Sequence, residues 1–370
     1  MRFVVFTHSL VSDWNHGNAH FLRGIAAELI ERGHQLRILE PADGWSRANL
    51  LAECGSSAIA AFETAYPRLR SELYDSAPLD LDAVLRNADV VIVHEWNPPE
   101  LIAAVGQHHA EHETYCLLFH DTHHRSLTDL DAMSAIDLSH YDGVLAYGEV
   151  IRQRYLLNGW ARCAWTFHEA ADIRVFHPIP GLPKDGDLVW IGNWGDDERA
   201  EELREFLIEP ARSLKLKATV YGVRYPDHAL RELARAGISY RGWLPNYRVP
   251  EIFARHRVTI HVPRRPYAEV LHGIPTIRPF EAMACGIPLI SAPWRDTENL
   301  FEAGSDFLFA RDGEAMKSAL RDVLRSKALA SSLAASGLAK IRERHTCAHR
   351  VDQLLGIVGQ CSTRTAGQAA

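Results

Sequence analysis

The sequence lacks any hydrophobic run long enough to cross a membrane. Its first segment, "RFVVFTHSL", predicts a strand and lacks the basic stretch and long apolar stretch of a signal peptide. We therefore expect a cytoplasmic protein. Peripheral association with the inner membrane stays open, because it requires neither of these features.

Cysteine pairs with metal-binding or redox spacing are also missing. The six cysteines are scattered without a CxxC motif, which suits a reducing compartment and thiols that pack as small apolar side chains. Excess positive charge is missing too, since 40 basic and 47 acidic residues give a net charge of −7. This balance argues against a general nucleic-acid-binding protein, so we expect no nucleic-acid partner.

What the sequence does contain is a regular alternation of short apolar segments and amphipathic segments. "RFVVF", "DVVIV" and "CLLF" predict buried strands, whereas "AHFLRGIAAELIERGH" has the apolar spacing of a helix that ends at Gly33. This alternation is typical of an α/β protein whose parallel sheet is covered on both faces. With 370 residues, the chain is long enough for two such domains.

The Pro/Gly-rich segment "FHPIPGLPKDGD" indicates a linker between the two domains. After it the alternation restarts, with "LVWIG", "KATVYG" and "VTIHVP" as predicted strands. We expect an N-terminal Rossmann-like domain, a C-terminal Rossmann-like domain, helices that pack back on the first domain, and a disordered tail. These parts cover residues 1–178, 187–335, 336–358 and 359–370, respectively.

Polar residues gather where the predicted strands of the first domain end. His94 and Glu95 follow one strand, His120 and Asp121 follow another, and the loop "SDWNHGNAH" follows the first strand. Ligands of open parallel sheets bind beyond the carboxyl ends of the strands, so these positions indicate a binding site. Each position also has a structural alternative. The histidines can be hydrogen-bonded structural residues, and the loop can cap the next helix.

The stretch "HGIPTIRPFEAMACGIPLISAPW" places one acidic residue, Glu281, in a short predicted helix among small and apolar neighbours. A buried carboxylate is unfavourable unless a partner or a ligand satisfies it. Thr276 and Ile277 lie at the predicted helix N-terminus, whose free N–H groups and dipole favour an anion. The alternative is that Glu281 caps a buried helix, although a capping acid normally lies nearer the first helical residue.

A family resemblance rests on four segments that occur in sequential order. They are "ADVVIVHEWNPPEL", "HEAADIRVFHP", "ISYRGWLPNYRVPEIFARHRVTIHVP" and "RPFEAMACGIPLI". Together they resemble GT-B glycosyltransferases, most closely the retaining family 4 enzymes and their spore-maturation-protein-like relatives. The resemblance covers nearly the whole chain. It implies two Rossmann-like domains facing a central cleft, and metal-independent transfer of a sugar from a nucleoside diphosphate to an acceptor, with retention of anomeric configuration.

The resemblance assigns a role to Glu281, whose carboxylate would accept hydrogen bonds from the ribose hydroxyls of the donor. Many family 4 members carry a second acid eight positions earlier, where this chain has Gly273, and Glu269 is the nearest acid upstream. Arg278 before the Phe-Glu pair fits the spore-protein-like branch. The Arg/Lys pair expected after "WIGN" is not plainly present, and Arg199 is the cation in that region.

The departing phosphate charge requires positive groups, and Arg264 and Arg265 follow the end of a predicted buried strand. The resemblance implies that His120 lies near the sugar, with Asp121 orienting it, and that the backbone of "GWLP" cradles the nucleobase. The predicted catalytic residues are His120, Asp121, Arg264 and Arg265. The predicted donor-binding residues are Glu281, Gly192, Asn193, Arg199, Arg224, Gly242, Trp243, Leu244, Thr276, Ile277 and Arg278. The predicted acceptor-side residues are Asn15, His16, Gly17, Asn18, His94 and Glu95.

Three motifs offer metal ligands, and each has a simpler interpretation. Asp129-Leu130-Asp131 matches the metal-binding string of another transferase fold, but an acid pair at a helix start more often caps it. "HDTHHR" and "HTCAH" space their ligands too closely for a typical zinc site. We therefore expect no metal and no cofactor besides the substrate, for which the family favours a UDP-sugar.

The acceptor is left open among a saccharide, a small molecule and a lipid-linked compound, and the oligomeric state is left open as well. Two other functions are compatible with the same fold. A nucleotide-sugar epimerase would need acid/base carboxylates near the sugar, which Gly273 disfavours. A nucleotide-sugar-binding protein without turnover needs no second acid.

Overall fold

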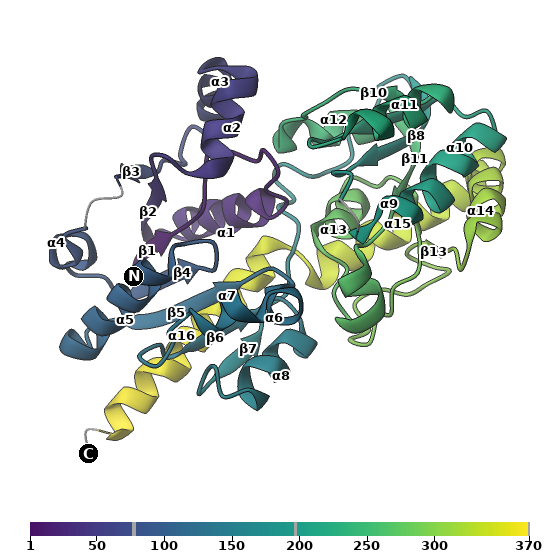
Figure 1. Cartoon of the computed structure of the whole chain (residues 1–370). Coiled ribbons are helices and arrows are strands. Elements are labelled where there is room, and N and C mark those ends of the chain that lie inside the picture. The colour runs from purple at the N-terminus through teal and green to yellow at the C-terminus, as the bar shows by residue number, and fades with distance from the viewer. Residues whose placement is uncertain (76–78, 196–197, 369–370) are drawn as a thin grey trace. The chain divides into compact units, whose positions relative to one another are not determined.

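The computed structural model describes residues 1–75, 79–195 and 198–368, which form two compact units (Figure 1). The first unit comprises Met1–His168 and Cys347–Ala370, and the second comprises Glu169–Thr346. The division therefore lies before the Pro/Gly-rich segment at which the sequence predicts a linker. Each unit is built on its own parallel sheet, so the predicted α/β class with two Rossmann-like sheets is confirmed.

The described residues of the first unit form a seven-stranded sheet in the order β3-β2-β1-β4-β5-β6-β7. Its strands are β1 (Arg2–Phe6), β2 (Gln35–Pro41), β3 (Glu72–Tyr74), β4 (Val90–His94), β5 (Cys116–Asp121), β6 (Gly143–Ala146) and β7 (Ala164–Thr166). Its helices are α1 (Ala19–Glu31), α2 (Trp45–Cys54), α3 (Ser57–Ala65), α4 (Leu81–Leu85), α5 (Pro99–His112), α6 (Arg125–Thr128), α7 (Leu130–Ser134), α8 (Glu149–Leu157) and α16 (Cys347–Gln368). Every residue of β4 and β5 is buried, as continuous apolar runs predict for central parallel strands.

The described residues of the second unit form a six-stranded sheet in the order β10-β9-β8-β11-β12-β13. Its strands are β8 (Gly186–Ile191), β9 (Ala218–Tyr221), β10 (Ser239–Tyr240), β11 (His256–His261), β12 (Leu289–Ser291) and β13 (Leu308–Phe309). Its α-helices are α9 (Ala200–Leu203), α10 (Glu209–Ser213), α11 (Asp227–Arg235), α12 (Val249–Ala254), α13 (Ile277–Ala284), α14 (Gly313–Arg325) and α15 (Lys327–Arg344). The π-helical segments η2 (Arg204–Ile208) and η4 (Pro266–Val270) and the 3₁₀ turn η3 (Asn246–Arg248) complete it.

One predicted helix is interrupted in the structure. The sequence "DDERAEELREFLIEPARSL" predicts a single helix, whereas the chain forms α9, the π-helical η2 and α10 in succession. Pro210 explains the change, because proline lacks the N–H that would bond to the carbonyl four residues earlier. The π-helical turn lies directly before this position.

The C-terminal helix α16 packs against α1 and β5 of the first unit, and Figure 1 shows it in yellow beside blue strands. Its buried apolar residues are Cys347, Val351, Leu354, Ile357, Val358 and Cys361. The helix begins at Cys347, and residues 336–344 belong instead to α15 of the second unit. It continues to Gln368 through the segment for which the sequence predicts a disordered tail, while residues 369–370 lie outside the described residues. In the described part of the chain, no helix is both long and apolar enough to span a bilayer.

Candidate active site

The carboxyl ends of β4 and β5 bring histidine side chains together. His94 and His120 are register partners on these strands, and their ring centroids lie 5.2 Å apart. His16, from the loop after β1, lies 6.3 Å from His94, and His8 lies 5.1 Å from His16. These four side chains, the imidazole cluster, include His120, His94 and His16 of the predicted site.

Burial keeps the imidazole cluster uncharged. It lowers the pKa of His8 and of His120 to about 4, and it holds the pKa values of His16 and His94 well below the usual range. All four rings are therefore neutral at pH 7, and a neutral imidazole can both donate and accept a hydrogen bond. Among the described residues, the Nε2 atoms of His120 and His16 have no hydrogen-bond partner. Such groups suit the hydroxyls of a sugar.

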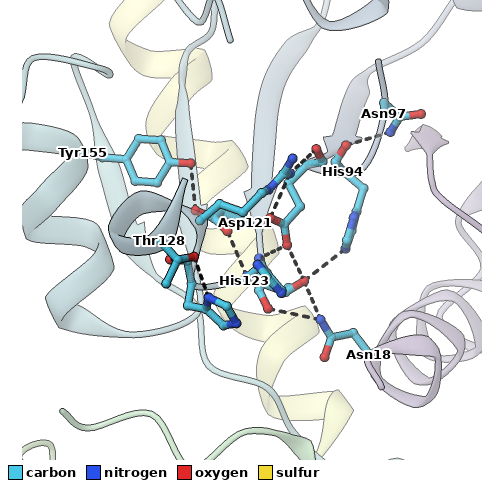
Figure 2. A network of polar contacts seen from close by, with 11 residues as sticks. Asn18, His94, Asn97, Asp121, His123, Thr128 and Tyr155 are labelled. Carbon is cyan, nitrogen blue, oxygen red and sulfur yellow. Dashed lines mark hydrogen bonds and ion pairs between the residues drawn. The ribbon is translucent and has the colours of Figure 1, made fainter. Parts of the chain in front are cut away.

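The chain behind the cluster is fixed by a second layer of polar contacts (Figure 2). The carboxylate of Glu95 accepts hydrogen bonds from Thr122 N at 2.8 Å and Thr122 Oγ1 at 2.9 Å, and Arg125 pairs with it at 3.1 Å. The amide of Asn18 donates to Thr122 Oγ1. Burial raises the pKa of Glu95, and the nearby Asp121 raises it further. Glu95 and Asn18 thus position the loop after β5, and neither stands free for an acceptor.

Asp121 does not orient His120 as predicted. Its carboxylate accepts hydrogen bonds from His123 N at 2.9 Å and from Tyr155 Oη at 2.8 Å, and Figure 2 shows Tyr155 pointing at it. The two residues are adjacent on β5, and successive side chains of a strand point to opposite faces of the sheet. Asp121 is therefore a positioning residue on the face opposite to His120.

The loop after β1 is held by two buried charged residues that the sequence analysis missed. Glu40 accepts hydrogen bonds from Leu10 N and Ser9 Oγ, while Arg23 donates to the carbonyls of Leu10 and Val11 at 2.9 Å. Arg23 also pairs with Asp13 at 2.8 Å. These contacts fix the loop that carries Asn15, His16 and the exposed Gly17.

A cavity of about 30 Å³ lies in the first unit beside His94 and His120. Apolar side chains of α1 and the sheet line most of it, including Phe21, Ile92 and Phe167. This volume holds no more than a water or two, so it is not the sugar site.

In the second unit, Glu281 on α13 is fully buried. Its Oε1 accepts a hydrogen bond from Asn246 Nδ2 at 2.8 Å, and its Oε2 pairs with Arg278 one turn away. Glu281 is the fifth residue of α13, beyond the positions at which an acid caps a helix. The partner Asn246 follows the "GWLP" segment, so the predicted nucleobase and ribose segments are joined by this bond.

A second buried acid, Glu169, was not predicted. It is 2 % exposed, and within the described residues neither carboxylate oxygen has a hydrogen-bond partner. Burial raises its pKa well above the usual range, the charge of Glu281 raises it further, and Arg278 opposes both. Glu169 and Glu281 thus form a pair of buried acids with one arginine. The segment "HEAAD" itself gives no sign that Glu169 is buried. Its neighbour Glu281 is far away in the sequence, so no local pattern could have revealed the pair.

The N-terminus of α13 is open to an anion. Thr276 has a φ of 61° and its side chain makes no capping hydrogen bond, so Ile277 and Arg278 begin the helix uncapped. Just before it, Gly273 has a φ of 91°, and a Cβ there would lie 2.7 Å from Glu298 Oε1. Glu298 therefore occupies the space that an acid at Gly273 would enter, whereas Glu269 is exposed on η4.

The arginines predicted near the donor differ in their pairing. Arg264 pairs with Glu198 at 2.6 Å, and Arg265 pairs with Glu202 at 2.6 Å. Arg199 forms no ion pair in the part of the chain that the structure describes, and it donates to the carbonyls of Asn193 and Val262. Burial, together with the charge of the nearby Arg264, lowers its pKa to about 9. An arginine so placed is the most available cation for a phosphate.

The remaining predicted donor residues lie at the carboxyl ends of β8, β9 and β10. Asn193 Oδ1 accepts a hydrogen bond from Val223 N at 2.9 Å, and Gly192 N donates to Tyr221 O at 2.9 Å. Arg224 is exposed on the loop after β9 with a φ of 59°. The segment Gly242, Trp243 and Leu244 is partly buried, and Leu244 packs against the core beneath α13.

The motifs weighed as metal sites have other roles here. Asp129 caps α7 by accepting a hydrogen bond from Ala132 N at 3.0 Å. His124 Nδ1 contacts Thr128 Oγ1 at 2.8 Å, and His345 Nε2 contacts Leu300 O at 3.0 Å. Over the described ranges, neither "HDTHHR" nor "HTCAH" gathers three ligand atoms around one point.

Comparison with known proteins adds a family to this geometry. Residues 199–356 match the family model described as glycosyl transferase-like. The second unit is a glycosyltransferase-like domain. The matched region contains α13 with Glu281, as well as Arg199, Asn246 and Gly273. A search of curated proteins finds no matching sequence.

Solved structures match both units together. HepE from Anabaena in complex with UDP-glucose is 15% identical with a TM-score of 0.67, covering 97% of this chain and 100% of HepE. A TarM variant from S. aureus is 10% identical with a TM-score of 0.71, covering 96% and 99%. Sucrose-phosphate synthase from Thermosynechococcus elongatus is 13% identical with a TM-score of 0.65, covering 98% and 100%. At these identities the likeness shows the fold, which is the two-domain GT-B fold of glycosyltransferases.

Proposed function

We propose that this chain is a glycosyltransferase that moves a sugar from a nucleoside diphosphate sugar to an acceptor. The observation that carries the proposal is Glu281, a fully buried carboxylate on a short helix with an uncapped N-terminus. It lies inside the region that matches a glycosyl transferase-like family. A buried carboxylate is a two-oxygen acceptor suited to the vicinal hydroxyls of a ribose.

The neighbouring groups support a role for each part of the donor. The N–H groups at the start of α13 and the guanidinium of Arg199 suit the diphosphate, because both favour an anion. Leaving-group stabilisation of this kind needs no metal ion, so we propose metal-independent transfer, with retention of configuration as the family resemblance implies. The neutral imidazole of His120 suits a sugar hydroxyl, whether on the donor or the acceptor.

Uridine diphosphate is the first nucleotide to test, because the solved structure of HepE carries UDP-glucose. The proposal covers three classes of acceptor, namely a saccharide, a small molecule and a lipid-linked compound. We also propose a cytoplasmic location, supported by the scattered cysteines without a CxxC motif, which suit a reducing compartment.

The test is thermal stabilisation by a panel of nucleoside diphosphates and their sugars, with and without EDTA. We expect one nucleotide to raise the melting temperature equally in both conditions. Glu281→Gln should weaken that binding about tenfold through the lost ribose contacts. Glu251→Gln on α12, a partly buried acid outside the proposed donor site, should leave it unchanged. Wild-type affinity in Glu281→Gln would refute the donor site.

Turnover separates the two alternatives. Release of nucleoside diphosphate with a new glycosidic product identifies a transferase, and NMR of the product shows whether the anomeric configuration is retained. Binding without turnover over a broad acceptor panel would favour the non-catalytic binding protein, and interconversion of two nucleotide sugars would favour the epimerase.

A further inference from the structure

A third cluster of polar side chains lies in the first unit, away from the imidazole cluster. It joins Asp82 on α4 to His108 and His112 on α5. Asp82 Oδ1 lies 3.3 Å from His108 Nε2 and 3.6 Å from His112 Nε2. Among the described residues, these three atoms are the ones that meet as potential metal ligands, all within 4.8 Å of one another.

The distances fit a shared ion. Zinc binds imidazole nitrogen and carboxylate oxygen at about 2.0–2.2 Å in tetrahedral geometry, which separates neighbouring ligand atoms by roughly 3.3–3.6 Å. The carboxylate of Asp82 already has this separation from both histidines. His108 and His112 are four residues apart on one helix, so their side chains extend from the same face.

The other ring nitrogens are held by hydrogen bonds that leave Nε2 available. His112 Nδ1 lies 2.9 Å from the carbonyl oxygen of His108, which can only accept, so Nδ1 carries the proton and Nε2 a lone pair. His108 Nδ1 lies 2.9 Å from Tyr115 Oη. Partners of this kind orient the histidines of metal sites and fix their tautomers.

The rings of His108 and His112 are in contact with each other. The two imidazoles stack with their centroids 4.2 Å apart and an interplanar angle of 17°, so protonating both would place like charges in contact. A carboxylate and two imidazoles whose ligand atoms all lie within 4.8 Å of one another therefore match a divalent ion better than they match two simple ion pairs.

We propose that Asp82, His108 and His112 bind one divalent transition-metal ion, with zinc favoured by the nitrogen and oxygen ligand set, and with water completing the coordination. The ion links the five-residue helix α4 to α5, which Ile102 and Val105 anchor in the core. The site shares no residue with the imidazole cluster and lies in the other unit of the chain from Glu281 and Arg199. It is a structural link and supplies no chemistry to metal-independent transfer.

The test uses the full chain, stripped with a chelator and titrated with ZnCl₂ by calorimetry near pH 7.5, and with Co²⁺ as a spectroscopic probe. We expect one ion per chain, a cobalt absorption spectrum typical of tetrahedral N/O coordination, and a higher melting temperature with zinc. His112→Ala and Asp82→Ala should each reduce zinc affinity roughly tenfold or more. Both side chains are substantially exposed, at 43% and 75%, so the variants should fold.

Glu111→Gln on α5 is the matched control, because Glu111 is outside the cluster and bonds to Gln107. It should bind zinc as the wild type does. The proposal would be overturned by the absence of stoichiometric binding, or by zinc affinity that both His112→Ala and Asp82→Ala leave unchanged. Binding of the nucleotide sugar is measured separately on the protein from which the chelator has removed metal. This measurement tests the proposed transferase, and its result does not depend on whether zinc binds.

Discussion

His120 combines deep burial with an unsatisfied ring nitrogen, and this makes the first unit sensitive to acid. Its pKa is about 4 in the folded chain against an ordinary value of 6.5. Between these values the unfolded chain binds more protons than the folded one, so stability falls as the pH drops from 6.5 to 4. A shift of this size corresponds to roughly 3 kcal/mol.

We therefore expect His120→Asn to lose less stability than the wild type over this pH range, measured by urea unfolding at several pH values. The raised pKa values of Glu95 and Asp121 increase stability as the pH falls, which is the opposite effect. The variant and the wild type both contain these two acids, so the comparison between them is not affected. The exposed His140→Asn serves as the control and should follow the wild type. Parallel curves for His120→Asn and the wild type would contradict the lowered pKa.

Glu169 gives a second pH-dependent prediction with the opposite sign. Its raised pKa means that the folded chain keeps a proton that the unfolded chain releases, so stability falls as the pH rises above about 4.5. Glu169→Gln removes the titrating group and keeps its shape. In the absence of ligand, we expect this variant to melt at a higher temperature than the wild type at pH 8, with the advantage shrinking towards pH 4.5. A constant difference across this range would contradict the raised pKa.

Single residues could be predicted from the sequence where their type conflicts with their surroundings. Glu281 stands out as one acid in an apolar segment, and His120 stands out because it ends a buried strand. Glu169 and Arg23 gave no such signal, because their environment depends on contacts with residues far away in the sequence. The pairing of Asp121 with His120 was wrong because neighbours in a strand face opposite sides of the sheet.

The strands could be predicted better than the segments between them. Continuous apolar runs identify β1, β4, β5 and β8, because central parallel strands are buried on both faces. Residues 42–80, whose described part contains α2, α3 and β3, have no comparable pattern. The sequence predicts disorder for residues 359–370 from their small polar composition, whereas the described backbone continues α16 to Gln368.

The carboxyl ends of β8 and β9 depend on a close backbone approach. A Cβ at Gly222 would lie 2.2 Å from the carbonyl oxygen of Gly192, and Gly222 has a φ of 155°. We expect Gly222→Ala to reduce the free energy of unfolding by about 2 kcal/mol or more, because the backbone must shift. Thermal unfolding measures this effect. Gly17→Ala should be nearly neutral, since a Cβ there meets no atom within 4 Å, and equal loss in both variants would argue against the contact.

At the scale of the whole molecule, the first unit is made of two separate stretches of chain. Helix α16 buries Val351, Leu354, Ile357, Val358 and Cys361 against this unit. Gln353 Nε2 also donates to Thr166 O at 2.7 Å, and Arg350 Nε donates to His168 O at 2.9 Å. The sequence predicts a returning helix, but the position of its start depends on tertiary contacts that local patterns do not contain.

Truncation after Thr346 should therefore destabilise the first unit selectively. The buried apolar side chains of α16 are worth on the order of 10 kcal/mol as an upper estimate, which is comparable to the stability of a whole domain. We expect limited proteolysis of the truncated chain to cut within residues 1–168 and to spare the second unit. A chain truncated after Cys361 keeps these side chains and should resist cleavage, and equal resistance of both chains would contradict the role of α16.

The split of the first unit also sets the order in which the protein can be completed during synthesis. Residues 1–168 leave the ribosome before the second unit, whereas the helix α16 that covers them leaves after it. The second unit is made in between, which takes roughly ten to thirty seconds at about 5–20 residues per second. During that time the apolar surface that α16 later buries is exposed on the nascent chain. The first unit can therefore complete its core only after the second unit has been synthesised.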